Sequence, residues 1–406
     1  MGFSLRLLQI DNESAARREV ERIGADPQGV SRMSAKMVPR LIKLSQVPCR
    51  AANILKQEML ALGGDAAVAR GTVACSISAT DVILIGSLKQ LRRLGSRLAH
   101  QPFGLADCGV QLQRLLALLD ESPPVLVGRS CRLNLDRPLI MGILNVTPDS
   151  FSDGGRFADA ESALRRGLVM AAEGADLIDI GGESTRPGAP AVALQEELDR
   201  VLPVIEALRR ECDIPLSIDT NKAAVAAAAI ADGAEFINDI SGLQFDPKMA
   251  TTVADGGAGL FVMHTRGRPE QMQKDTVYPD LLAAVVEGLR DSLRVAIDAG
   301  VAEEKLAVDP GIGFGKSAGG NLELLQRLGE LHGLGRPVLL GTSRKGFIGR
   351  VTGRSEPTER LYGTLATVAL GVQQGVQLFR VHDVGPARDA ARMAWAIRCA
   401  AMPQCD

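Results

Sequence analysis

The chain has 406 residues, which suits about two domains at roughly 150 residues each. Apolar residues make up 46% of it, enough for a large core, and aromatic residues only 3%. The formal net charge of −2 excludes the charge bias of proteins that bind nucleic acid or membrane surfaces through bulk electrostatics, so we expect small-molecule partners, with no nucleic acid and no membrane.

The sequence also predicts where the protein works. No apolar run is long enough to span a bilayer, and the opening MGFSLRLLQI lacks the apolar core and cleavage site of a signal peptide. Seven cysteines are scattered along the chain without a CxxC pair, which is typical of reduced and mostly buried thiols. These features predict a cytoplasmic protein.

Residues 1–130 differ in pattern from the rest and predict a small α/β domain of unknown role. The pair Pro123-Pro124, followed by Gly128, is a plausible boundary before a second domain at residues 131–406. In the first domain we expect strands at Ser4–Ile10, Ala66–Ala69 and Asp81–Ile85, and helices at Glu13–Ile23, over most of Ser34–Leu62, at Leu88–Leu98 and at Leu112–Leu119.

The helix expected at Leu88–Leu98 carries a basic run. Its members are Lys89, Arg92, Arg93 and Arg97. Such a run is either a patch that binds an anionic polymer or one solvated face of a helix, and the solvated face is the commoner case. The sequence leaves the role of this domain open.

From Pro138 onward, short apolar runs alternate with longer helical segments. The strands are expected at Leu139–Asn145, Ala175–Ile180, Pro215–Asp219, Glu235–Asp239, Gly259–His264, Lys305–Asp309, Pro337–Leu340 and Val376–Val381. The helices between them include Ala160–Glu173, Ala193–Arg210, Asn221–Asp232, Leu281–Ala299, Asn321–Leu331 and Leu361–Gln373. This alternation predicts a parallel sheet, and eight strands predict a closed (β/α)8 TIM barrel. A doubly wound open sheet is the alternative.

Polar or charged residues follow all eight apolar runs. In chain order they are Asn145, Glu183, Asp219, Asn238 with Asp239, His264, Asp309, Ser343 with Lys345, and Arg380 with His382. Turn formation would need only Gly, Asn, Asp and Pro, and it does not explain Arg, His and Lys. In a barrel these positions converge on one mouth, which is where such enzymes place their sites.

Two carboxylates and an amide at the strand ends suggest a heterocyclic ligand. Asp219 and Asn238 end neighbouring strands, and Asp309 adds a second acid; together they match a ring with N–H donors and N or O acceptors. Asp219 could instead cap the next helix, but Thr220 is available for that. The glycine-rich stretch after Asp309 is no P-loop, since Pro310 stands where the first glycine is required.

Basic residues near the same strand ends suggest an anionic group on the ligand. They are Arg186, Lys345, Arg380 and His382, and they neighbour glycine-containing loops. Ser343 follows strand seven, where barrel enzymes often hold phosphate.

Four further residues have a structural and a functional explanation. We expect Arg344 to pair with a nearby acid, and His264 to be either a packed histidine or a catalytic one. Asn145 and Asp149 could help to hold Mg²⁺, which needs ligand phosphates to complete its shell, although turn capping explains Asp149 almost as well.

The motifs around these residues resemble those of the dihydropteroate synthases of the folate pathway. They are, in order, NVTPDSFSDGG, DIGGESTRPGA, SIDT, INDISG, MHTRG, DPGIGFGKS, TSRKGFIG and RVHDV, and they span about residues 138–400. The resemblance implies a pterin-binding TIM barrel that uses Mg²⁺ and forms a homodimer. It implies the condensation of 6-hydroxymethyl-7,8-dihydropterin pyrophosphate with p-aminobenzoate to dihydropteroate and pyrophosphate, with sulfonamides as competitors. It implies nothing for residues 1–130.

The resemblance also implies roles for single residues. Asp219, Asn238, Asp309 and Lys345 would hold the pterin, and Asn145 would bind Mg²⁺ and pyrophosphate. Six residues are predicted to carry the chemistry: Asp219, Asp309, Lys345, Asn145, Arg380 and His382. Eight are predicted to contact the substrates: Asn238, Thr185, Arg186, Pro187, Phe314, Ser343, Met263 and Asp149.

Two other functions remain as alternatives. A pterin-dependent methyltransferase shares the barrel and the Asp/Asn grip on the pterin, but it has no need of Lys345, Arg380 or His382. A regulatory pterin-binding protein without activity would be expected to have lost the loops after strands one and two, and both are intact here.

Overall fold

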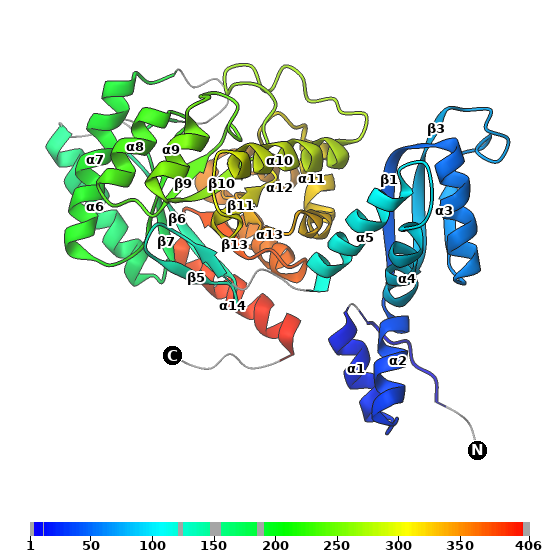
Figure 1. The fold of residues 1–406 in the computed structure, drawn as a ribbon. Helices are drawn as coiled ribbons and strands as arrows, with labels where there is room; N and C mark the ends of the chain where they lie inside the picture. The colour runs from blue at the N-terminus through cyan, green and yellow to red at the C-terminus, as the bar shows by residue number, and fades with distance from the viewer. Residues whose placement is uncertain (1–3, 11, 121–124, 147–155, 185–190, 401–406) are drawn as a thin grey trace. The chain divides into compact units, whose positions relative to one another are not determined.

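The computed structural model describes residues 4–10, 12–120, 125–146, 156–184 and 191–400. The chain forms two compact units, Met1–Asp120 and Glu121–Asp406 (Figure 1). None of the described helices is long and apolar enough to cross a membrane. The six cysteines in the described part of the chain are unpaired, but only Cys49 is buried, so the expectation of mostly buried thiols is wrong.

The N-terminal unit is built on an antiparallel sheet of three strands in the order β1-β3-β2. In β3, Val82 and Leu84 are buried while Ile83 and Ile85 are partly exposed, so one face of the sheet carries the core. Its elements are α1 Glu13–Arg22, α2 Pro27–Met37, β1 Pro39–Pro48, α3 Cys49–Ala61, β2 Asp65–Val68, β3 Ala79–Ser87, α4 Leu88–Leu98 and α5 Leu105–Asp120.

Two sequence-based expectations for this unit are wrong. Residues 39–48 form strand β1 and not part of a helix, because Leu41 and Ile42 alternate between exposed and buried with the period of a strand. The prolines at positions 39 and 48 stand at the strand ends, where a missing N–H is tolerated. Residues 4–10 have no regular structure and are mostly exposed, so the strand expected there does not form.

The second unit contains eight parallel strands in the order β11-β10-β9-β8-β7-β6-β13-β12. A parallel bridge between Val308 and Val338 links the two ends of this order, so the barrel is nearly closed and the open doubly wound sheet is excluded. The prediction of a TIM barrel is confirmed, and no strand bound differs from its expected position by more than two residues. The strands are β6 Leu139–Asn145, β7 Leu177–Gly181, β8 Leu216–Asp219, β9 Phe236–Asp239, β10 Gly259–Met263, β11 Leu306–Asp309, β12 Leu339–Leu340 and β13 Leu378–Val381.

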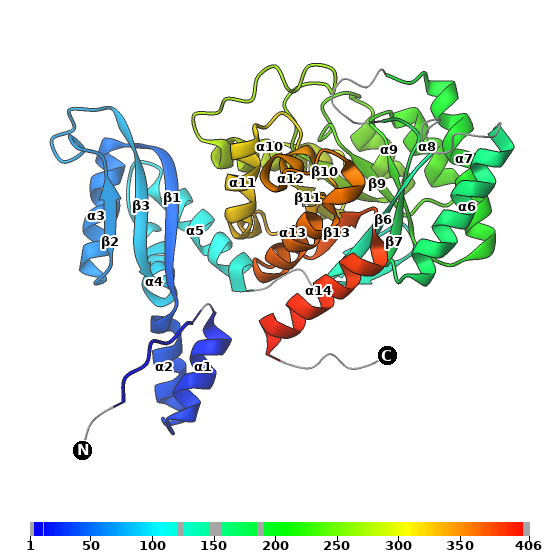
Figure 2. The same cartoon turned by 180° about the vertical axis from the view of Figure 1, so that it is seen from behind.

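Helices surround these strands, as the two opposite views show (Figures 1 and 2). Outward-facing strand residues such as Ile178, Ile218 and Val262 pack against them in the main core. The helices are α6 Arg156–Ala172, α7 Leu194–Glu211, α8 Ala223–Ala231, α9 Met249–Gly256, α10 Leu281–Asp298, α11 Ala318–Gln326, α12 Gly346–Thr352, α13 Leu361–Gln373 and α14 Val384–Cys399, with short 3₁₀ turns η2 Glu303–Lys305, η3 Leu328–Leu334 and η4 Pro357–Arg360.

A hairpin of β4 Val125–Val127 and β5 Arg132–Asn134 packs on the lower interior of the barrel. The carboxylate of Glu235, the residue before β9, accepts hydrogen bonds from the backbone N–H of Ser130 (2.6 Å) and of Cys131 (3.0 Å). The apolar side chains of the hairpin join an inward-facing layer that fills the lower end of the barrel. This layer consists of Leu126, Leu133, Leu135, Leu139, Met141, Leu177, Phe236, Phe261, Ala307, Leu339 and Leu378.

Strand alternation places a second, polar layer above this apolar one. Side chains two residues apart on a strand point to the same face, so the residue two positions after each lower-layer member also points inward. On β7, β8, β9, β11 and β13 this upper layer is Asp179, Ser217 with Asp219, Asn238, Asp309 and Arg380. The upper layer lies toward the C-terminal ends of the strands, where TIM-barrel sites form.

Candidate active site

Asp179 is the centre of the polar layer. It is fully buried, and its Oδ1 accepts a hydrogen bond from Ser217 Oγ at 2.6 Å. Its Oδ2 accepts from Asn238 Nδ2 at 3.0 Å and from Arg380 Nε at 2.6 Å. One carboxylate thus fixes the side chains of three strands. Sequence reasoning missed Asp179 because it lies inside the apolar run of β7 and not after it; a charged residue within a buried strand was the available signal.

Arg380 also binds the predicted site residue Asp219. Its Nη2 donates to Asp219 Oδ2 at 2.7 Å, whereas Asp219 Oδ1 is buried and has no hydrogen-bond partner among the described residues. Burial raises the pKa of Asp219 to about 7, although the charge of Arg380 lowers it. A buried acceptor without a donor is costly, and a ligand N–H would remove that cost.

Asp309 faces the same interior from β11. Its Oδ1 accepts the backbone N–H of Gly311 at 2.7 Å, and burial raises its pKa. Gly311 has φ +68°, and a Cβ there would lie 1.9 Å from the carbonyl oxygen of His264, so only glycine fits. Asp309 is therefore held in place by a turn that its own motif builds.

Lys345 and Phe314 meet above Asp309. The Nζ of Lys345 lies 4.1 Å from the centre of the Phe314 ring, a cation–π contact. Burial, together with the charge of Arg380, lowers the pKa of Lys345 to about 8. Phe314 in turn packs with Ile240, Met263 and Met272, so the predicted residues Met263 and Phe314 share one apolar wall.

Two glycines leave space inside the polar layer. A Cβ at Gly181 would lie 3.6 Å from both Asn145 Oδ1 and Asp219 Cβ, and one at Gly341 would lie 3.7 Å from Asp309 Oδ2. Side chains at these inward positions would fill the space beside the carboxylates and Asn145. Their absence leaves room for a flat ligand to reach the acids.

Ser343 and His382 form a pair at the mouth. Ser343 Oγ lies 2.9 Å from His382 Nδ1 and accepts the backbone N–H of His382 at 3.1 Å. Burial, with the charges of Arg344 and Arg380, lowers the pKa of His382 to about 3, so its ring is neutral at pH 7. Arg344 pairs with Asp383, its Nη2 lying 2.6 Å from Oδ1, which confirms the structural role expected for it.

The comparisons with known proteins agree with this geometry. A family model described as pterin binding enzyme matches residues 141–382, more than half of the chain. The chain belongs to the pterin binding enzymes. The dihydropteroate synthase of Synechocystis is 45% identical over 275 residues, which are 68% of this chain and 95% of that protein. The resemblance drawn from the motifs is confirmed.

Other pterin binding enzymes match in structure and over the N-terminal unit. Structures of the dihydropteroate synthase of Xanthomonas albilineans, with 4-aminobenzoic acid and with 7,8-dihydropteroate, have TM-scores of 0.65 and 0.62, identities of 46% and 44%, and cover 68% of this chain and 99% of theirs. A probable bifunctional folylpolyglutamate synthase/dihydropteroate synthase of Halobacterium salinarum is 43% identical over 97% of this chain. The chain spans about half of that relative, 47%.

In this pterin binding enzyme, Asn145, Asp219, Asn238, Met263, Asp309, Phe314, Ser343, Lys345, Arg380 and His382 are described, and they lie at or beyond the C-terminal ends of the barrel strands. Asp149, Thr185, Arg186 and Pro187 lie outside the described residues. Their predicted roles stay predictions.

Lys316 is a second residue that sequence reasoning missed. It is 2% exposed, and its Nζ lies 3.0 Å from His264 Nδ1 and donates to the carbonyl oxygens of His264 (3.2 Å), Gly311 (3.0 Å) and Phe314 (2.9 Å). It thereby holds the loop that carries Gly311 and Phe314. Burial lowers the pKa of His264 to about 3, and that of Lys316 to about 7. His264 is thus a packed, neutral partner of Lys316.

We expect the stability lost in Lys316→Met to grow with pH. The pKa of Lys316 is about 7 in the folded protein and 10.5 in the unfolded chain, so between these values the folded protein binds fewer protons. The free energy of unfolding of the wild type therefore rises with pH across this range, whereas methionine does not titrate. Urea unfolding at pH 7 and pH 9 should show a larger gap between wild type and Lys316→Met at pH 9. Lys274→Met, at an exposed position, is the matched control. A gap that shrinks with pH would contradict this assignment.

Proposed function

We propose that the barrel catalyses dihydropteroate synthesis, joining 6-hydroxymethyl-7,8-dihydropterin pyrophosphate to p-aminobenzoate with release of pyrophosphate. The observation that carries the proposal is the buried Oδ1 of Asp219, which has no partner among the described residues and faces the inward layer of strand ends. We assign the activity to the barrel unit, Glu121–Asp406, and a separate role to the unit Met1–Asp120.

The pterin lies against the polar layer in this proposal. Asp219 and Asp309 accept N–H groups of the ring, while the amide of Asn238 both donates and accepts. Lys345 lies above Phe314 and donates to a ring oxygen or nitrogen. Arg380 stays on Asp179 and Asp219, so the ring meets side chains that are already fixed and little ordering is needed on binding.

The diphosphate would lie at the mouth, with Mg²⁺. The described residues contain no group of three or more His, Cys, Asp or Glu side chains that could hold a metal by itself. Asn145 offers one amide oxygen beside the space at Gly181, which suits Mg²⁺, because this ion keeps several waters and substrate phosphates in its shell. Bound Mg²⁺ would neutralise charge on the leaving pyrophosphate. Arg186, Arg380 and His382 supply the remaining contacts to it.

The bond between the pterin methylene and the diphosphate oxygen breaks first, and its electron pair leaves with pyrophosphate. The pterin ring stabilises the positive charge on the methylene, and the carboxylates of Asp219 and Asp309 favour that charge. The amine of p-aminobenzoate then attacks the methylene and loses a proton. An aromatic amine is already nucleophilic, so no strong general base is required.

The p-aminobenzoate site would lie above the pterin. Phe314 and Met263 provide an apolar wall, and Ser343, held by His382, provides a hydroxyl at the mouth. Thr185, Pro187 and Asp149 complete it in the proposal. Sulfonamides would compete with p-aminobenzoate here.

We infer a homodimer formed through α13 and α14. These two helices pack against each other and leave large apolar side chains exposed: Tyr362 (81%), Leu370 (60%), Met393 (63%) and Ile397 (61%). Apolar side chains gathered on one helix pair are typical of a protein interface.

Turnover tests the proposal. Purified chain supplied with the pterin diphosphate, p-aminobenzoate and Mg²⁺ is expected to release one pyrophosphate for each dihydropteroate formed, and omitting either substrate should stop both. Pterin binding by folded protein without pyrophosphate release would contradict the synthase and favour a methyltransferase or a regulatory protein.

A further inference from the structure

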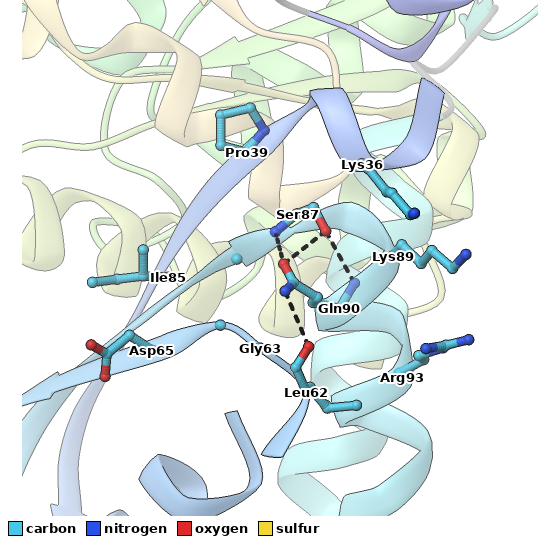
Figure 3. A pocket seen from close by; sticks show the side chains of 12 residues that line it. Lys36, Pro39, Leu62, Gly63, Asp65, Ile85, Ser87, Lys89, Gln90 and Arg93 are labelled. Atoms are coloured by element: carbon cyan, nitrogen blue, oxygen red, sulfur yellow. Dashed lines mark hydrogen bonds between the residues drawn. The ribbon is translucent and has the colours of Figure 1, made fainter. Parts of the chain in front are cut away.

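The N-terminal unit has a cavity of about 700 Å³ beside β3 and the start of α4, and this cavity is a hollow wide open to solvent, not an enclosed space (Figure 3). Lys36, Lys89 and Arg93 line it, and their side chains extend to the same side of the view, opposite Asp65 and Ile85. Asp65 is the one acid among the described residues that line the cavity. The site is therefore cationic although the whole chain is almost neutral.

The structure divides the basic run of α4 into two pairs. Arg92 forms an ion pair with Glu13 at 3.5 Å, and Arg97 forms one with Glu58 at 3.2 Å. Lys89 and Arg93 face the cavity and have no acidic partner within the described part of the chain. The run is thus divided: Arg92 and Arg97 form ion pairs within the unit, whereas Lys89 and Arg93 line the cavity.

The positions of Lys89 and Arg93 are unfavourable for the helix alone. Lys89 lies in the first turn of α4, where the helix dipole disfavours a cation, and this turn contains no acidic residue. Lys89 and Arg93 are four residues apart on one face, so their like charges repel. An anion in the cavity would offset both costs.

The walls of the cavity are fixed before any ligand binds. Gln90 Nε2 donates to the carbonyl oxygen of Leu62 at 3.1 Å, and its Oε1 accepts the backbone N–H of Ser87 at 2.8 Å (Figure 3). A Cβ at Gly64 would lie 2.8 Å from the carbonyl oxygen of Ile85, so this close approach of turn and strand requires glycine. Pro39, Leu62 and Ile85 add apolar surface to the same cavity.

We propose that this cavity binds a small phosphorylated molecule of nucleotide size. Its volume lies within the range of small-molecule sites, its three cations suit phosphate oxygens, and its apolar side can hold a base or a similar ring. A nucleic acid would need basic side chains along an extended surface, but Arg92 and Arg97 are engaged by acids. This site is additional to the pterin site and does not depend on the function proposed for the barrel.

Calorimetric titration of the full chain with ATP tests the proposal. We expect saturable binding that Lys89→Glu/Arg93→Glu weakens at least tenfold. Arg70→Glu is the control: it reverses one charge at an exposed position of the same unit outside the cavity. It should leave ATP binding unchanged. Inorganic phosphate should bind more weakly than ATP, because it cannot use the apolar side; equal binding would reduce the site to a bare anion site and overturn the nucleotide-sized ligand.

Absence of ATP binding, or ATP binding that the double variant leaves intact, would overturn the proposal. So would binding of a single-stranded oligonucleotide that the double variant abolishes while ATP does not bind. Circular dichroism checks the fold of the double variant. If it is unfolded, Lys89→Gln/Arg93→Gln replaces it, and a loss of ATP binding of at least fivefold is then required. Pyrophosphate release by the barrel should be the same in all these variants.

Discussion

Replacing Asp219 with asparagine is expected to weaken pterin binding by about a hundredfold, which corresponds to the 1.5–3 kcal/mol typical of a hydrogen bond to a charged group. The asparagine can still accept from Arg380, so the change falls on the buried Oδ1 that awaits a ligand donor. The N–H₂ group of the asparagine would then face the N–H groups of the ring, so two donors would oppose each other without an acceptor. Isothermal titration with a dihydropterin measures the effect, and Asp298→Asn, at an exposed position, is the control.

The pH dependence of binding sharpens this prediction. The raised pKa of about 7 means that the free protein increasingly holds Asp219 protonated below pH 7. Because the ring N–H groups need the carboxylate, wild-type affinity should fall as pH decreases from 7.5 to 5.5, and the substitution Asp219→Asn should remove this component. Equal pterin affinity in wild type and variant across this pH range would contradict the placement of Asp219 in the pterin site.

Asp179→Ala is expected to cost about 3–5 kcal/mol of unfolding free energy, the usual effect of removing one partner of a buried ion pair. The variant deprives Arg380, Ser217 and Asn238 of a common acceptor, and among the described residues only Asp219 then accepts a hydrogen bond from the guanidinium. Urea unfolding measures the loss. Asp213→Ala, at an exposed position, should change stability by less than about 0.5 kcal/mol.

A loss of less than about 1 kcal/mol in Asp179→Ala would mean that Asp179 is not the centre of the polar layer. A second readout separates its positioning role from plain stability. At a temperature where the variant is folded, pterin affinity should still fall, because Arg380 and Asn238 are no longer held beside Asp219.

The barrel and most of its polar layer were predictable from sequence because their signals are local. Each strand is a short apolar run. Asp219, Asn238, Asp309 and Arg380 lie at the ends of such runs, and a basic residue such as Arg380 is not explained there by turn formation. Strand alternation then fixes which side chains share the interior. The eight strands and the TIM barrel follow from this pattern and are confirmed.

The features that were missed depend on contacts between distant segments. Asp179 lies within an apolar run, and only its meeting with Arg380, 201 residues away, explains its charge. Lys316 is adjacent to a glycine-rich loop, and its partners at His264 become visible only when β10 and β11 are side by side. In the N-terminal unit, the sequence predicts a helix over β1 because prolines fit helix breaks as well as strand ends, and only the pairing of β1 with β3 distinguishes the two.

The proposed function places the pterin on the unpaired oxygen of Asp219. A crystal structure of the chain with a bound dihydropterin would show whether it lies there. We predict a ring N–H within hydrogen-bond distance of Asp219 Oδ1, the amide of Asn238 on the same ring, and Arg380 still bound to Asp179. A pterin bound elsewhere in the barrel, with Asp219 Oδ1 still unpaired, would contradict this placement.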